Sequence, residues 1–146
     1  MKKKLVIIIF ILVLIIAAVA IYFAINTQEQ TYEVEQEIYS GSAEIRIKEG
    51  TLTNTSATII IKNKTESPIG YGKEYRIDKQ INGEWREIKA KDEDYIIDAI
   101  GYLIDGGKET EEKIDWTDLY GELKKGKYRL VKEIGSEYAS VEFEIE

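Results

Sequence analysis

Residues 115–132 read DWTDLYGELKKGKYRLVK, and this stretch decides the fold. Within it, the pattern Leu123-x-x-Gly126-x-Tyr128 places a tyrosine after a tight turn, at the start of a strand predicted over 128–134. In β-sandwiches such a tyrosine can fold its hydroxyl back onto upstream backbone, an arrangement called a tyrosine corner. We therefore predict that Tyr128 fixes a late strand of a sandwich.

The sequence outside this stretch also predicts short strands. Residues 43–48 alternate apolar and charged side chains, and residues 56–63 are β-branched and apolar enough to be buried on both sides. Asn82-Gly83 is a strong hairpin signal because both residues tolerate a positive φ. Turn signals recur about every 8–12 residues, which is typical of an all-β antiparallel sandwich. The expected strands are 32–35, 43–48, 56–63, 71–79, 84–89, 95–104, 108–116, 128–134 and 138–145.

Two segments and two side chains complete the expected fold. Residues 95–104 also suit a short helix, and residues 118–125 look helical for a turn or two. We expect Trp85 and Trp116 in the core, where each buries roughly 150–250 Å². The alternative for both tryptophans and Tyr128 is a ligand-stacking role, as in carbohydrate-binding modules; we favour the structural role.

Three motifs follow one another along the chain: Tyr71-Gly72-x-x-Tyr75-x-Ile77, Gly83-x-Trp85, and Asp115-Trp116-x-x-x-Tyr120-Gly121-x-Leu123-x-x-Gly126-x-Tyr128-Arg129-Leu130-Val131-Lys132. Together they resemble a family of bacterial immunoglobulin-like domains, over about residues 43–146. That family occurs in exported proteins of low-GC Gram-positive bacteria, often behind an N-terminal anchor. The resemblance implies an immunoglobulin-like sandwich and no particular activity. One departure is Leu103-Ile104-Asp105-Gly106, which lacks a proline before the glycine and leaves that turn's type open.

The N-terminal segment has the composition of a membrane anchor. Residues 5–25 form an uncharged apolar run behind Lys2–Lys4, and a helix of about 21 residues spans about 30 Å. The positive-inside rule then places residues 1–4 in the cytoplasm and the rest outside the cell. The alternative is a cleavable signal peptide, since Ala18-Val19-Ala20 has the small-x-small form of a cleavage site. After the anchor we expect a spacer over 26–37 and the sandwich domain over 38–146.

The composition excludes several kinds of chemistry. The chain has no cysteine and no histidine, so it lacks disulfides, thiolate ligands, a cysteine nucleophile and a lipoprotein acylation site. Beyond Lys2–Lys4, 17 basic residues face 27 acidic ones, a net charge of −10. Such a surface repels nucleic acid and anionic lipid headgroups. The Lys-, Glu- and Ile-rich usage is typical of bacterial cell-surface proteins.

We expect no catalytic residue, cofactor or metal site. Lys91-Asp92-Glu93-Asp94 offers oxygen ligands for Ca²⁺ but lacks the spacing and glycine of a calcium loop, so a solvated acidic loop is the better interpretation. Glu109, Glu111 and Glu112 are expected on the solvent face of a strand. A carboxylate pair for glycoside hydrolysis would depend on a separation that sequence does not provide.

Two functions remain open from the sequence. The first is a non-catalytic, membrane-anchored extracellular module that binds a protein or cell-envelope partner. The second is a secreted proteinase inhibitor or regulatory sandwich. Its inhibitory loop would be residues 63–70 (NKTESPIG), which contain the chain's only proline, Pro68. The plainer interpretation of that loop is an inter-strand connection stiffened by proline.

Overall fold

The computed structural model describes residues 11–21, 31–33, 41–91 and 100–146. All strands described are antiparallel, which confirms the predicted all-β class. The strands are β1 (Thr31–Glu33), β2 (Ala43–Ile47), β3 (Ser56–Asn63), β4 (Ile69–Tyr71), β5 (Arg76–Ile81), β6 (Glu84–Ile88), β7 (Tyr102–Ile104), β8 (Glu109–Asp115), β9 (Gly126–Ile134) and β10 (Glu137–Ile145).

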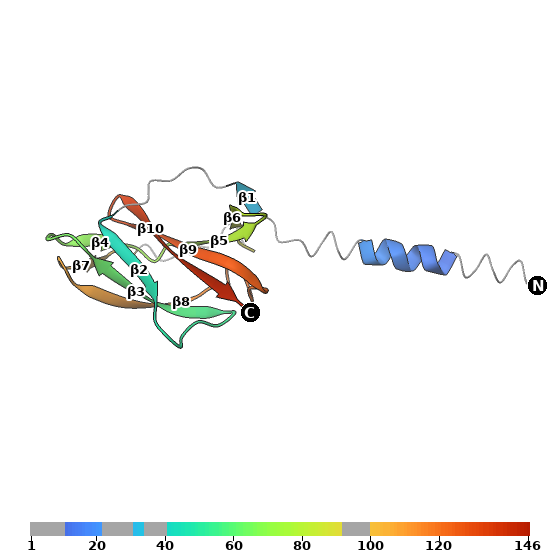
Figure 1. Cartoon of the computed structure of the whole chain (residues 1–146), viewed down its shortest axis with the longest axis horizontal. Coiled ribbons are helices and arrows are strands. Elements are labelled where there is room, and N and C mark those ends of the chain that lie inside the picture. Colours follow the sequence, from blue (N-terminus) through green and yellow to red (C-terminus); the bar gives the residue numbers. More distant parts are fainter. Residues whose placement is uncertain (1–10, 22–30, 34–40, 92–99) are drawn as a thin grey trace, which may run out of the picture. The chain divides into compact units, whose positions relative to one another are not determined.

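Two sheets make up the sandwich (Figure 1). The smaller sheet has the order β2-β3-β8, and the larger has the order β1-β6-β5-β9-β4-β7. Strand β9 is central in the larger sheet: β5 pairs with its first half, β4 joins at Ile134, and β10 runs along its other edge. The strand predicted from Tyr128 is thus the one on which the larger sheet is built.

The N-terminal part, residues 1–30, is a separate compact unit from residues 31–146. Within it, residues 11–21 form a helix whose side chains are exposed. Among the residues described, none of the helices has both the length and the apolar run needed to cross a bilayer. The remainder of the predicted tail and anchor, residues 1–10 and 22–25, lies outside the described residues.

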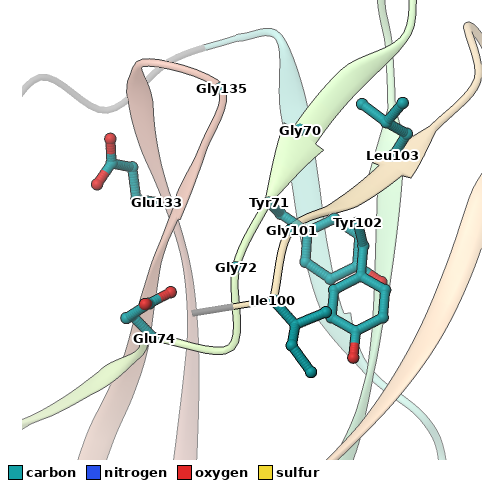
Figure 2. A pocket seen from close by; sticks show the side chains of 10 residues that line it. All are labelled: Gly70, Tyr71, Gly72, Glu74, Ile100, Gly101, Tyr102, Leu103, Glu133 and Gly135. Carbon is teal, nitrogen blue, oxygen red and sulfur yellow. The ribbon is translucent and has the colours of Figure 1, made fainter. Parts of the chain in front are cut away.

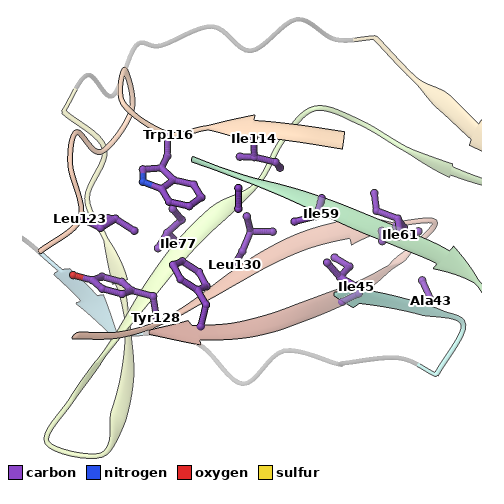
Figure 3. Packing of buried hydrophobic residues seen from close by; sticks show 14 of the residues in the cluster. Ala43, Ile45, Ile59, Ile61, Ile77, Ile114, Trp116, Leu123, Tyr128 and Leu130 are labelled. Atoms are coloured by element: carbon purple, nitrogen blue, oxygen red, sulfur yellow. The ribbon is translucent and has the colours of Figure 1, made fainter. Parts of the chain in front are cut away.

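The core lies between the two sheets (Figure 3). Period-2 alternation brings Ile45 of β2 and Ile59 and Ile61 of β3 onto the inner face of the smaller sheet. Ile60, on the outer face of β3, is also buried, as the apolar run predicted. The larger sheet contributes Ile77, Ile88, Tyr128, Leu130, Ile134, Ala139, Phe143 and Ile145.

The single strand expected over 71–79 is wrong in one respect, because a bend over residues 72–75 separates two strands, β4 and β5. At this bend the carbonyls of Gly72 and Glu74 turn toward Lys132, whose Nζ donates to them at 2.6 and 3.1 Å. Those acceptors are therefore satisfied by a side chain and not by a ladder of strand hydrogen bonds.

The other local expectations have mixed outcomes. The hairpin at Asn82-Gly83 is confirmed, with φ values of 53° and 88° that match a type I′ turn. The segment 118–125 is not a helix: a single hydrogen-bonded turn over 117–120 ends at Gly121, where φ is 77°. Of the predicted strand 95–104, β7 supplies the last three residues, and 92–99 lie outside the described residues.

Candidate functional site

The motif residues occupy three places in the sandwich. Some form one end of the core, some lie on the outer face of the larger sheet, and some surround a buried ion pair near the bend after β4. In that order, these are Trp116, Tyr120, Gly121, Leu123, Gly126 and Tyr128, with Tyr75 against Tyr120; Trp85 and Arg129; and Tyr71 and Gly72.

Tyr128 has the geometry of a tyrosine corner. Its side chain is fully buried, and its hydroxyl donates to the Lys124 carbonyl at 2.6 Å. Its ring stacks on Phe143 at 5.7 Å, and Trp116 stacks on the same phenylalanine at 5.7 Å. The Trp116 indole donates to the Asn54 carbonyl at 2.9 Å. These aromatic rings are enclosed by the fold, which supports the structural role expected for them (Figure 3).

The turn before β9 is organised by Asp115. Its carboxylate accepts hydrogen bonds from the Thr117 hydroxyl at 2.6 Å and from the Thr117 amide at 3.0 Å. These bonds lower the pKa of Asp115, the hydroxyl bond most. The Tyr120 amide then donates to the Trp116 carbonyl at 2.8 Å, and Gly121 ends the turn with a positive φ.

Tyr120 sits between this turn and the larger sheet. Burial raises the pKa of Tyr120 to about 12. A backbone hydrogen bond from Ile77, the next largest effect, lowers this pKa, and the nearby carboxylates of Glu87 and Asp78 raise it. Its ring meets Tyr75 edge to face at 6.3 Å between centroids. Tyr120 is consequently neutral at physiological pH and acts as a packing residue.

Trp85 is not in the core, contrary to the expectation. Side chains alternate along β6, so the buried Ile88 places Trp85, three residues earlier, on the outer face. There its ring lies 5.0 Å from the guanidinium of Arg129, whose Nε is 2.6 Å from Asp78 Oδ2. Arg76 Nε donates to the other Asp78 oxygen at 2.9 Å. The buried Asp78 carboxylate is thus held by two arginines.

Glu112 is also placed differently from the expectation. Along β8, alternation turns Glu112 inward while Glu109 and Glu111 face solvent. Its carboxylate bridges the two sheets: Oε2 lies 3.2 Å from Lys132 Nζ, and Oε1 lies 3.3 Å from Lys73 Nζ. The Lys132 side chain is fully buried, and that of Glu112 is 5 % exposed. The result is an inter-sheet ion pair inside the sandwich.

The two lysines differ in their electrostatics. Burial lowers the pKa of Lys132, against the opposing attraction of Glu112. Burial also lowers the pKa of Lys73, but the Glu112 charge and its hydrogen bond outweigh it, so that pKa is raised. The lysine nitrogens lie 5.6 and 5.0 Å from the centroids of Tyr71 and Tyr102, which stack at 5.3 Å. The two lysines therefore make cation–π contacts with a stacked pair of tyrosine rings.

An open hollow lies beside this cluster, next to β4, β7 and the end of β9 (Figure 2). Its volume is 780 Å³. Two exposed apolar side chains, Ile100 and Leu103, lie along it, and two exposed carboxylates, Glu74 and Glu133, lie across the glycine backbone from them. The remaining lining residues are Gly70, Tyr71, Gly72, Gly101, Tyr102 and Gly135.

The loop 63–70 is braced by the buried side chain of Asn63. Its amide nitrogen donates to the carbonyls of Ser67 at 2.7 Å and Ile104 at 2.9 Å. Its amide oxygen accepts from the Thr65 amide at 2.9 Å and the Thr65 hydroxyl at 2.8 Å. Gly106 packs on this loop so closely that an added Cβ would lie 2.1 Å from the Glu66 carbonyl oxygen. The connection between β3 and β4 is therefore held in place by the hydrogen bonds of Asn63.

The predicted acidic loop cannot be placed, because Asp92, Glu93 and Asp94 lie outside the described residues. In the part of the chain that the structure describes, no group of three or more acidic side chains is arranged to hold a metal ion.

The family model of the bacterial Ig-like domain matches residues 21–146. The chain belongs to this family. A search among curated proteins gives no match. The family assignment agrees with the resemblance carried by the three motifs, and the antiparallel sandwich is the architecture that the family name describes.

Two features of this bacterial Ig-like domain escaped the sequence analysis. The buried pair between Glu112 and Lys132 was missed because each residue has a charged neighbour in the chain, and only the inward register of its side chain distinguishes it. The hollow was missed because Gly72 belongs to the fold motif and Gly70 to the predicted loop 63–70, and neither glycine was considered for a binding surface. A glycine within a short predicted strand, which leaves backbone without a side chain, was the available signal.

Proposed function

We propose that this bacterial Ig-like domain is a non-catalytic extracellular module, anchored in a membrane by residues 5–25, that binds a protein or cell-envelope partner. The observation that carries the proposal is the hollow beside β7. Leu103 and Ile100 are 76 % and 51 % exposed, and within the described part of residues 31–146 they are the large apolar side chains left most open to solvent. Exposed apolar groups gathered at one place are typical of interaction sites.

The arrangement of acidic groups supports a non-catalytic role. General acid–base catalysis needs a carboxylate with an accessible position and a suitable pKa. Among the described residues, the buried carboxylates are those of Asp78 and Glu112, and each contacts two cationic side chains. Both groups are thereby used to hold the sandwich together.

The anchor is supported by the sequence, in which Lys2–Lys4 precede an uncharged run to Ile25. To test it, intact cells expressing the chain with a cytoplasmic N-terminal tag are treated with protease and then fractionated. We expect the tag to remain in the membrane fraction, resistant to alkaline carbonate, while the sandwich is digested. An undigested full-length chain on the cells, or a shortened chain released into the medium, would contradict the proposal.

A proteinase inhibitor is the second candidate, and the bracing of loop 63–70 is what favours it. Inhibitory loops bind tightly when they are rigid before binding. Asn63 provides that rigidity, and Lys64 and Pro68 are exposed on the loop. A panel of serine and cysteine proteinases tests it, with Lys64→Ala as the variant. Inhibition lost in Lys64→Ala would favour this candidate, whereas no inhibition by the wild type would exclude it for that panel.

A further inference from the structure

The hollow has the form of a trough floored by β4. Tyr71 pairs with Tyr102 and also with Ile134, and these side chains face the core side of the larger sheet. Alternation therefore turns Gly70 to the outer face, where it presents backbone without a side chain, and the Glu74 carboxylate lies against Gly72, just past the end of the strand. The outer face of this strand is thus bare at Gly70, with the Glu74 carboxylate at its end.

Side chains from the neighbouring strands rise on both sides of the trough. Leu103 of β7 is the cross-strand partner of Gly70, and Glu133 of β9 faces outward one residue before Ile134. Two strand spacings separate β7 from β9, about 10 Å, which is room for one extended side chain or backbone. One wall is therefore apolar and the other carries a carboxylate.

The charges near the trough favour a cationic occupant. The exposed carboxylates of Glu133 and Glu74 lie on one side of it (Figure 2). Lys132 of β9 and Lys73 of the bend after β4 are both paired with Glu112. Residues 26–146 carry a net charge of −10, so the electrostatic potential of the whole domain is negative, like that of the two carboxylates.

We propose that this trough binds the lysine or arginine side chain of an extended segment of a partner protein. The aliphatic stem lies over the bare backbone of Gly70 against Leu103 and Ile100, and the cationic end reaches Glu133 and Glu74. This inference rests on the proposed interaction function and names the chemistry of the partner. A second copy of this acidic chain is disfavoured by charge repulsion.

The test is a titration of the full chain in non-ionic detergent micelles, followed by amide chemical shifts. The probe is a short acetylated and amidated peptide of alternating lysine and threonine. Two matched peptides carry acetyl-lysine, which keeps the stem and removes the charge, or glutamate in place of lysine. We expect the lysine peptide to shift the amides of Gly70, Gly101 and Gly135, and the matched peptides to leave them in place. Added salt should weaken the binding.

Variants locate the contacts. Glu74→Gln with Glu133→Gln should weaken the lysine peptide by about three- to tenfold, since exposed ion pairs are individually modest. Gly70→Ala should also weaken it, because the added Cβ fits at 3.8 Å from the Tyr102 carbonyl oxygen and occupies the trough without displacing the strand. Glu44→Gln with Glu49→Gln removes the same two charges at exposed positions that do not line the trough; this matched control should bind as the wild type does. A circular dichroism melt of each variant verifies that the fold is retained.

Several results would overturn the inference. The inference is overturned if the lysine peptide leaves the glycine amides unshifted, or if the acetyl-lysine peptide binds as tightly as the lysine peptide. It is also overturned if the control variant loses as much affinity as the Glu74/Glu133 variant. Shifts that depend on protein concentration alone would indicate that a second copy of the chain occupies the trough. If the sandwich is digested on intact cells and the tag stays in the membrane, but the lysine peptide does not bind, then the anchored function holds and only the inference about the trough is refuted. If the chain is instead released, the anchored function fails independently of the trough.

Discussion

Replacing Lys132 by methionine tests whether the inter-sheet ion pair governs stability. The Lys132 ammonium lies 3.2 Å from Glu112 and donates to the carbonyls of Gly72 and Glu74 at 2.6 and 3.1 Å. Methionine keeps most of the aliphatic volume and removes these contacts. The change thus isolates the charge and its hydrogen bonds from the packing of the stem.

The expected magnitude follows from what is left behind. Removing one partner of a buried ion pair costs about 3–5 kcal/mol, because the other charge stays buried. Lys73, 3.3 Å from the second Glu112 oxygen, still compensates part of that charge. The carbonyls of Gly72 and Glu74 lose their donor, which adds to the cost. We expect a total loss of about 3–4 kcal/mol, a large share of a typical stability of about 5–15 kcal/mol.

The assay is urea unfolding of the full chain in non-ionic micelles, followed by tryptophan fluorescence, with a double-mutant cycle. Glu112→Leu alone leaves Lys132 buried without its anion and should also destabilise the sandwich. The double variant Lys132→Met/Glu112→Leu replaces the pair by apolar groups and should lose less than the sum of the two single changes.

The matched control is the exposed pair Lys48–Glu111 on the smaller sheet, 2.8 Å apart and about half exposed on both sides. Lys48→Met should cost less than about 1 kcal/mol. The argument for the buried pair is refuted if Lys132→Met costs no more than Lys48→Met, or if the two single changes in the cycle add without coupling.

Two further predictions concern tyrosines. Tyr128→Phe should lower the free energy of unfolding by about 1–3 kcal/mol in the same urea assay, since it removes the hydrogen bond from the tyrosine hydroxyl to the Lys124 carbonyl. Tyr138→Phe, at a half-buried position of β10, is the control and should change the free energy of unfolding little. Equal effects of the two substitutions would show that the tyrosine corner is not a source of stability. Folding raises the pKa of Tyr120 from 10.0 to about 12, so the folded state binds the phenolic proton more tightly than the unfolded state does. The contribution of this proton to the free energy of unfolding is complete below pH 10 and disappears as the pH rises toward 12. Stability measured between pH 9 and 11 should therefore fall less in Tyr120→Phe than in the wild type, and parallel curves would contradict this assignment.

The sequence by itself determined the class of the fold and its most ordered elements. Period-2 alternation predicted β2, an apolar run predicted β3, which is buried on its inner face and at Ile60 of its outer face, and Asn82-Gly83 predicted the hairpin between β5 and β6. The pattern around Tyr128 identified the strand on which the larger sheet is built. These features are readable because each depends on residues close together in the chain, whose spacing directly reflects strand geometry.

Only the tertiary structure decided on which face of a sheet each side chain lies and which side chains contact one another between sheets. Glu112 and Lys132 are 20 residues apart on different sheets, and only the pairing of those sheets makes them an ion pair. Trp85 has the composition of a core residue, but the register of β6 turns it outward onto Arg129. The trough over Gly70 exists because β7 and β9 flank β4. Cross-strand neighbours and sheet faces are set by long-range pairing, and a shift of one residue exchanges the two faces.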